Sequence, residues 1–238
     1  MAGHSKWANI KHKKSRADAA KGKLFSRITK EIINAVKQGG SDPKANPKLR
    51  LALTKAKAAN LPNENIERNI KKASSKDQSD FTEMMYELYG HGGVGILAEV
   101  MTDNKNRISS DMRIATNKKG GSVATPGSVS FNFERKGVLQ VAKDSCSEDE
   151  LFLIATEAGA EDFEQSDEYF MITTAPDELY KVKDAIESKK ILCEEATLEH
   201  IPKSSVDCDD ESKEKNIALI EYLEDLDDVD AVFHNMNL

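Results

Sequence analysis

The sequence KGKLFSRITKEIINAVKQGG, at residues 21–40, predicts an amphipathic helix. Leu24, Ile28, Ile32 and Val36 recur every four residues, a spacing that places side chains on one face of an α-helix. The two glycines that end the stretch are typical of a helix C-terminus. We therefore expect one long helix here, with its apolar face turned to a core and its cations turned outward.

Two shorter helices are expected to follow this one. The second covers about residues 48–59. The third covers about residues 64–73, with Asn63 as its N-cap and with Ile66 and Ile70 on its inner face. Three short helices joined by short links predict a small helical bundle.

After the bundle, short strands alternate with helices. Residues 136–137, Lys-Gly, are expected to form the turn of a hairpin. Such alternation predicts an α+β architecture, which we interpret as two ferredoxin-like domains. The expected strands are 84–89, 95–102, 129–133, 138–141, 163–164, 169–173, 195–201 and 229–234; the expected helices are 106–119, 148–158, 176–188 and 217–226, with an acidic loop at 207–211.

Charge is divided unevenly along the chain, whose formal net charge is −7. Residues 1–80 contain 19 Lys and Arg against 7 Asp and Glu, a net charge of +12. The remaining 158 residues contain 15 against 34, a net charge of −19. This asymmetry favours a basic region that binds a polyanion, attached to acidic domains. The alternative is that the basic part docks on the acidic part.

Residues 1–20 hold several cations and few apolar residues, so we expect a basic, flexible arm. Trp7 either stacks on a base or packs on its own domain. Arg107 starts a predicted helix, where it either contacts a phosphate or caps the helix beside solvent. The residues expected to bind nucleic acid are Lys6, Trp7, Lys11, Lys13, Lys14, Arg16, Lys23, Arg27, Lys30, Arg50, Arg68, Lys71, Lys72 and Arg107.

No motif in the sequence indicates catalysis. The glycine-rich residues 90–93 lack the lysine of a phosphate-binding loop, and no nucleophile or zinc-protease motif is present. Cys146, Cys193 and Cys208 are too far apart for a metal site and suit free thiols in a reducing cytosol. A weak Mg²⁺ contact at residues 209–211 is the one metal alternative. We expect no enzyme activity, cofactor, metal or small-molecule substrate, no membrane span and a cytoplasmic location.

The chain resembles the bacterial YebC/PmpR family, whose mitochondrial relatives are translational activators of cytochrome c oxidase. It departs from the family at His91, where a proline is common, and at Ala124-Thr125-Pro126. The motifs that carry the resemblance are Ala2-Gly3-His4-Ser5-Lys6-Trp7, Ile10-Lys11, Gly22-Lys23, Lys30-Glu31-Ile32, Asp42-Pro43, Asn46, Leu49-Arg50, Asn65-Ile66-Glu67-Arg68, Ile70-Lys71-Lys72, Thr102-Asp103-Asn104, Asn106-Arg107, Gly127-Ser128-Val129, Leu223-Glu224-Asp225 and Asp227-Asp228-Val229.

This resemblance implies three domains, with the third inserted into the second, and no enzymatic activity. The expected divisions are an arm at 1–20, a helical nucleic-acid-binding domain at 21–78, a middle α+β domain at 79–142 plus 209–238, and an inserted α+β domain at 143–208.

Two functions follow from the resemblance. The first is a DNA-binding regulator of transcription that acts on promoter DNA, which is the label that the family carries. The alternative is a ribosome-associated translation factor that contacts ribosomal RNA and relieves stalls at proline-rich stretches. The absence of a helix-turn-helix or zinc-finger signature favours the alternative.

Overall fold

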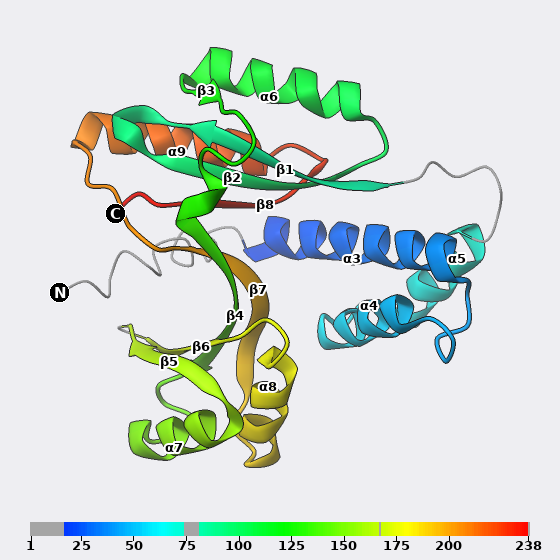
Figure 1. The fold of residues 1–238 in the computed structure, drawn as a ribbon. Helices are drawn as coiled ribbons and strands as arrows, with labels where there is room; N and C mark the ends of the chain where they lie inside the picture. Colours follow the sequence, from blue (N-terminus) through cyan, green and yellow to red (C-terminus); the bar gives the residue numbers. More distant parts are fainter. Residues whose placement is uncertain (1–16, 74–80, 167, 238) are drawn as a thin grey trace.

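The computed structural model describes residues 17–73, 81–166 and 168–237. It contains a helical part, followed by two antiparallel sheets that each carry helices on one face (Figure 1). The mixed α+β, multidomain architecture expected from the sequence is therefore confirmed.

The helical part consists of α3 (Ala17–Gly39), α4 (Pro47–Ala58) and α5 (Asn63–Ala73). Its core is formed by apolar residues of all three helices, including Ile32, Leu49 and Ile66. α3 begins at Ala17, so the expected end of the arm at residue 20 is wrong. The Ala-rich start of α3 explains the difference, because alanine has the highest helix propensity.

Buried Asn46 fixes the turn between α3 and α4. Its side-chain oxygen accepts the backbone N–H of Leu49 at 3.0 Å, and its amide donates to the carbonyls of Ala35 at 2.7 Å and Gly40 at 2.8 Å. A Cβ on Gly39 would lie 2.8 Å from the Asn46 side chain. A residue with no side chain at position 39 is thus required for this cap to form.

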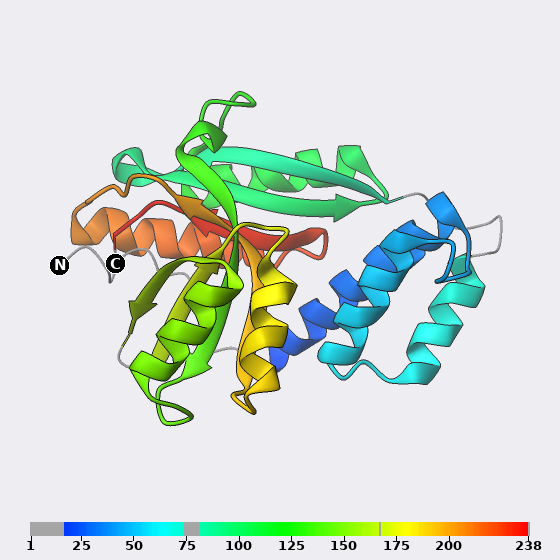
Figure 2. The same cartoon turned by 60° about the horizontal axis from the view of Figure 1, so that its bottom comes forward.

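The first sheet contains β1 (Thr82–Tyr89), β2 (Gly95–Thr102), β3 (Ser122–Val123) and β8 (Val229–His234), in the order β3-β1-β2-β8. A single 3₁₀ turn at His91–Gly93 joins β1 to β2. α6 (Lys105–Lys119) and α9 (Asp210–Glu224) cover one face and share its apolar core. Figures 1 and 2 show α3 on the other side of this sheet, next to the second sheet.

The second sheet contains β4 (Phe133–Ala142), β5 (Ala160–Gln165), β6 (Tyr169–Thr174) and β7 (Cys193–Pro202), in the order β5-β6-β4-β7. α7 (Glu148–Ala158) and α8 (Leu179–Ser188) pack on it. The chain order β4-α7-β5-β6-α8-β7 is that of a ferredoxin-like fold.

Two predictions about β4 are wrong. The expected hairpin around residues 136–137 is one continuous strand, and that strand pairs with β6 and β7 rather than with the first sheet. Residues 133–142 therefore belong with the inserted part, not with the middle domain. Gly137 is needed for close packing and not for a turn, because a Cβ there would contact the Thr174 hydroxyl and approach Leu179 Cβ to 2.9 Å.

The acidic loop expected at residues 207–211 is partly helical. α9 begins at Asp210, and the Asp209 carboxylate caps it by accepting the Ser212 backbone N–H at 2.7 Å. This hydrogen bond lowers the pKa of Asp209. The acidic residues thus serve the helix N-terminus, whose partial positive charge they stabilise.

Candidate nucleic-acid interface

The outward faces of α4 and α5 carry exposed cations. Residues 17–73 contain 13 Lys and Arg against 5 Asp and Glu, a net charge of +8. Within the described residues, no carboxylate forms an ion pair with Arg50, Lys57 or Lys71, and Arg68 donates to Asn65 Oδ1 at 3.1 Å. These side chains remain available to an anionic partner. The exposed cations of α4, of α5 and of the turn before α4 are Lys44, Lys48, Arg50, Lys57, Arg68, Lys71 and Lys72, and of these Lys48 donates to Gln38 Oε1 of α3 at 2.7 Å.

The charges of α4 point more strongly to a ligand than those of α5. In α5, Glu64 lies in the first turn and Lys71 and Lys72 lie in the last, an order that the helix dipole favours in any protein. α4 has cations and no acidic residue, with Lys48 in its first turn. The helix dipole opposes a cation at that end, so helix stability does not account for this sequence.

Arg27 and Lys30 do not lie on the outer face of the bundle, and that expectation is wrong. The Arg27 guanidinium lies 3.1 Å from Glu99 of β2 and 3.5 Å from Glu31. The Lys30 ammonium donates to the carbonyls of Met101 at 3.1 Å and Asp227 at 2.9 Å. For these two cations, the alternative holds: the basic part docks on the acidic part.

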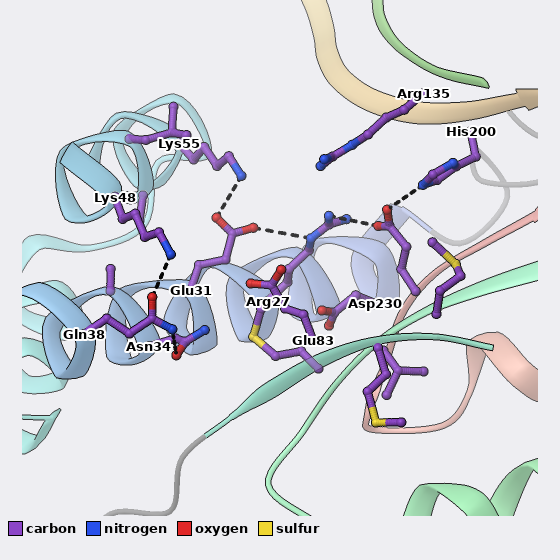
Figure 3. Close-up of a pocket in the computed structure, with 18 residues that line it drawn as sticks. Arg27, Glu31, Asn34, Gln38, Lys48, Lys55, Glu83, Arg135, His200 and Asp230 are labelled. Atoms are coloured by element: carbon purple, nitrogen blue, oxygen red, sulfur yellow. Dashed lines mark hydrogen bonds and ion pairs between the residues drawn. The ribbon is translucent and has the colours of Figure 1, made fainter. Parts of the chain in front are cut away.

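Carboxylates from three elements act on Arg27, namely Glu31 of α3, Glu99 of β2 and Asp230 of β8, and Figure 3 labels Glu31 and Asp230 beside its side chain. Glu31 also accepts a hydrogen bond from Lys55 Nζ at 2.8 Å. Glu99 also pairs with Nε2 of His200, on β7, at 3.2 Å. Burial opposes ionisation of Glu99, but the His200 hydrogen bond and the charge of Arg27 lower its pKa. The same carboxylates raise the pKa of Arg27 despite its burial. The network therefore keeps its charges and ties α3 to both sheets.

A cleft of about 700 Å³ opens beside this network. α3 and α4 line one side, β1 and β2 line the floor, and Arg135 and His200 approach from the second sheet (Figure 3). Its cations and carboxylates are largely paired with one another. The cleft lies where the three parts of the molecule meet, and we call this contact region the joint. It is not a site built for one ligand.

Sequence reasoning missed the partners in this joint. Arg27 and Glu99 lie 72 residues apart, and Lys30 and Asp227 lie 197 residues apart. No periodicity or motif links positions at such separations. Within the sequence, only the charge asymmetry indicated that some basic residues contact acidic ones.

Asp230 is the buried carboxyl of the joint, with its side chain 9% exposed and 3.7 Å from Lys30 Nζ. Burial raises its pKa from 3.8 to about 6, although Lys30 and Arg27 oppose the rise and Glu31 and Glu99 add to it. The folded chain therefore binds this proton more tightly than the unfolded chain does. The contribution of Asp230 to stability grows as the pH falls from about 6 toward 4.

We expect Asp230→Asn to raise the free energy of unfolding at pH 7 by on the order of 1–3 kcal/mol, because the variant buries no charge. The advantage over the parent protein should shrink as the pH falls through 6, where the parent carboxyl takes up its proton. Urea unfolding at several pH values measures this difference. Asp227→Asn, at an exposed position, is the control, and a constant advantage for Asp230→Asn between pH 4.5 and 7.5 would contradict the assignment.

The guanidinium of Arg107 forms hydrogen bonds to two carboxylates, those of Asp228 and Asp103. Its Nε lies 2.9 Å from Asp228 Oδ2, its Nη2 lies 2.9 Å from Asp228 Oδ1, and Nη2 also lies 2.7 Å from Asp103 Oδ1. The Thr102 hydroxyl donates to the same Asp228 carboxylate at 2.9 Å. These hydrogen bonds raise the pKa of Arg107. Arg107 joins the start of α6 to the segment before β8.

Arg107→Ala should lower the free energy of unfolding by about 1–2 kcal/mol, because buried Asp228 loses its cation. Half of the Arg107 side chain is exposed, which limits the loss. Arg113→Ala is a matched control on the same helix, and it should change stability by less than about 0.5 kcal/mol. Equal stability of the two variants in thermal and urea unfolding would show that the Asp228 contact is dispensable.

Several predicted contact residues lie outside the described residues. They are Lys6, Trp7, Lys11, Lys13, Lys14, Arg16 and the side chain of Lys23. Their part in binding stays a prediction.

The described part of the chain offers neither a metal cluster nor a membrane-spanning helix. There, no three His, Cys, Asp or Glu side chains gather as a metal ion requires, so the Mg²⁺ alternative at residues 209–211 receives no support. Among the described helices, none combines the length and apolar character needed to cross a bilayer.

Comparison with known proteins shows similarity along nearly the whole chain. Family models described as "TACO1/YebC protein N-terminal domain" and "TACO1/YebC second and third domain" match residues 5–76 and 81–236. A Protochlamydia amoebophila protein named "Probable transcriptional regulatory protein" is 68% identical over 238 residues, which cover 100% of this chain and 97% of the relative. A Chlamydia pneumoniae protein with the same name is 58% identical over 238 residues and matches along 100% of both chains.

A solved structure shares the fold. The crystal structure of a conserved hypothetical protein from Aquifex aeolicus has a TM-score of 0.83 and 45% sequence identity to this chain. The match covers 97% of this chain and 96% of the Aquifex protein.

Proposed function

The chain belongs to the TACO1/YebC family, and from that premise we propose that it is a non-enzymatic regulator of gene expression that binds nucleic acid through its helical part. The relatives bear the names of regulatory proteins, not of enzymes. We propose a cytoplasmic location and promoter DNA as the first target.

One observation carries this proposal: the cations of the helical part divide into two sets. Arg27, Lys30 and Lys55 face the rest of the chain and are paired with its carboxylates or carbonyls or with Glu31. Arg50 and Lys57 face outward, and no described carboxylate pairs with them. The inward cations thus bind groups of the protein itself. The outward cations suit an external polyanion.

The alternative is a ribosome-associated translation factor that contacts ribosomal RNA and relieves stalls at proline-rich stretches. The outward cations favour this translation role in one respect. Lysine contacts to phosphate carry no sequence information, so they serve RNA as well as DNA. The joint at Arg27 also fixes the basic helices to an acidic body, and that body would restrict how a long duplex approaches.

A competition titration separates the two functions. The full chain is titrated with a promoter duplex and with a scrambled duplex at several salt concentrations, with ribosomal particles as competitor. A preference for the promoter of about a thousandfold or more at physiological salt, unchanged by ribosomes, supports transcription. A ratio near one, with ribosomes removing the protein from DNA, supports the alternative. No binding to either at low salt would overturn the proposed function itself.

A further inference from the structure

α6 is a basic island in an acidic part of the molecule. It contains five cations, Lys105, Arg107, Arg113, Lys118 and Lys119, and one acidic residue, Asp111. The rest of the chain after residue 80 contains 10 Lys and Arg against 33 Asp and Glu. Such a concentration of one charge on a single helix, within a region of the other charge, is unexpected from composition.

The start of α6 opposes the usual arrangement of charge on a helix. Its first turn contains Lys105 and Arg107 and no acidic residue, whereas the first turns of α7 and α9 are acidic. Cations near a helix N-terminus are unfavourable because the helix dipole is positive there. Asp228 and Asp103 neutralise Arg107. Lys105 has no such ion pair in the described residues, so stability does not explain it.

The outward face of α6 presents hydrogen-bond donors in one line. Asn106, Ser110, Arg113 and Asn117 are exposed at spacings of four, three and four residues, which place them on one face of the helix. No described carboxylate forms an ion pair with Arg113. This line suits an extended anion rather than a single small one.

The two ends of the helix contribute differently to this surface. Lys118 lies 5.6 Å from the centre of the Tyr222 ring of α9, and Lys119 is exposed beside it. Both also suit the negative end of the helix dipole. Within the described residues, Lys105 and Arg113 are therefore the unpaired cations of α6 that helix stability does not explain, because neither lies at the negative end of the helix dipole.

α6 is separate from the basic surface of α4 and α5. α6 packs with α9 on the face of the first sheet that points away from α3 (Figures 1 and 2). The sheet stands between α6 and α3. Any ligand of α6 therefore meets a second surface of the protein and not an extension of the first.

We propose that α6 forms a second nucleic-acid contact, in which Arg113 on its outward face and Lys105 at its N-terminal end bind the phosphodiester backbone. This inference rests on the proposed function. The guanidinium of Arg113 and the ammonium of Lys105 form charge-assisted hydrogen bonds to phosphate oxygens, while Asn106, Ser110 and Asn117 add neutral donors. Acidic α9 beside α6 repels the backbone and restricts the contact to the outward face and the N-terminal end of α6.

The test compares three double variants of the full chain. Lys105→Glu with Arg113→Glu alters α6. Arg50→Glu with Lys57→Glu alters α4. Lys181→Glu with Lys215→Glu, at exposed positions on α8 and α9, is the control with the same change in net charge. Each is titrated with a duplex DNA fragment and, separately, with purified ribosomal RNA at several salt concentrations.

We expect the α6 variant to lose about tenfold or more in affinity relative to the control on at least one probe. Its slope of log affinity against log salt should fall in magnitude by about 2, for two lost phosphate contacts. The probe that is affected identifies DNA or RNA as the backbone that α6 contacts. Thermal unfolding checks the fold, and Lys105→Gln with Arg113→Gln replaces the glutamate pair if that pair unfolds.

Two other outcomes are distinguishable. If the α6 variant matches the control on both probes while the α4 variant binds weakly, the α6 contact is overturned and the proposed function stands. If the parent protein binds neither probe, the proposed function fails and this inference fails with it.

Discussion

Replacing Arg50, Lys57, Arg68 and Lys71 together by glutamate is expected to reduce the affinity for duplex DNA or ribosomal RNA by about hundredfold or more at low salt. These residues are exposed on α4 and α5. Each substitution removes an ion-releasing contact and adds a repulsive charge. Fluorescence anisotropy with labelled duplex and RNA fragments at several salt concentrations measures the loss.

The inward cations provide a contrasting experiment. Arg27→Ala should lower stability, because Glu99 and Glu31 each lose one of their two partners. It should affect low-salt affinity much less than the four-residue change. The opposite ranking, with Arg27→Ala abolishing affinity and the four-residue variant unaffected, would move the interface to the cleft between the sheets.

Gly137→Ala is expected to lower the free energy of unfolding by about 2–3 kcal/mol, which is large for one added methyl group. Glycine to alanine in an unstrained position normally stabilises by restricting the unfolded chain. Here the new Cβ would contact the Thr174 hydroxyl and lie 2.9 Å from Leu179 Cβ, where α8 begins. Denaturant unfolding measures the change.

Glu134→Ala, at an exposed position in the same strand, should change stability by about 0.5 kcal/mol or less. Should Gly137→Ala prove as stable as the parent protein, α8 must be able to move away from β4 at little cost. The close approach would then not be the reason for glycine at this position.

Local signals in the sequence predicted individual elements well. The helix expected at residues 148–158 has the same bounds in the structure, where the Ser147 hydroxyl caps it by accepting the Glu150 backbone N–H at 3.3 Å. The apolar periodicity of Ile28 and Ile32 predicted α3, and both residues are buried. Such signals depend on neighbours within one or two turns of the chain, which the sequence displays directly.

Non-local packing is where prediction failed. The sequence predicts a turn at Gly137, but the structure places this glycine within β4, where a Cβ would approach Leu179 at the start of α8. Arg27 and Lys30 resemble the other lysines and arginines of the bundle in every local respect. Only the fold shows that their partners are on β2 and next to β8. A linear pattern of charge cannot separate cations that bind within the protein from those that face outward.

The position of β8 has a consequence for biosynthesis. The first sheet pairs β2 with a strand made after every other strand, and Thr102 and Asp228 lie 126 residues apart. On a translating ribosome, the helical part emerges first and the second sheet completes before the first one closes. Asp227 precedes β8, and Asp230 belongs to it. Lys30 therefore lacks these two partners until that segment is synthesised. The nascent helical part can contact β2 earlier, through Arg27 and Glu99 and through Lys30 and Met101, but its docking should be completed only in one late step, when β8 is added.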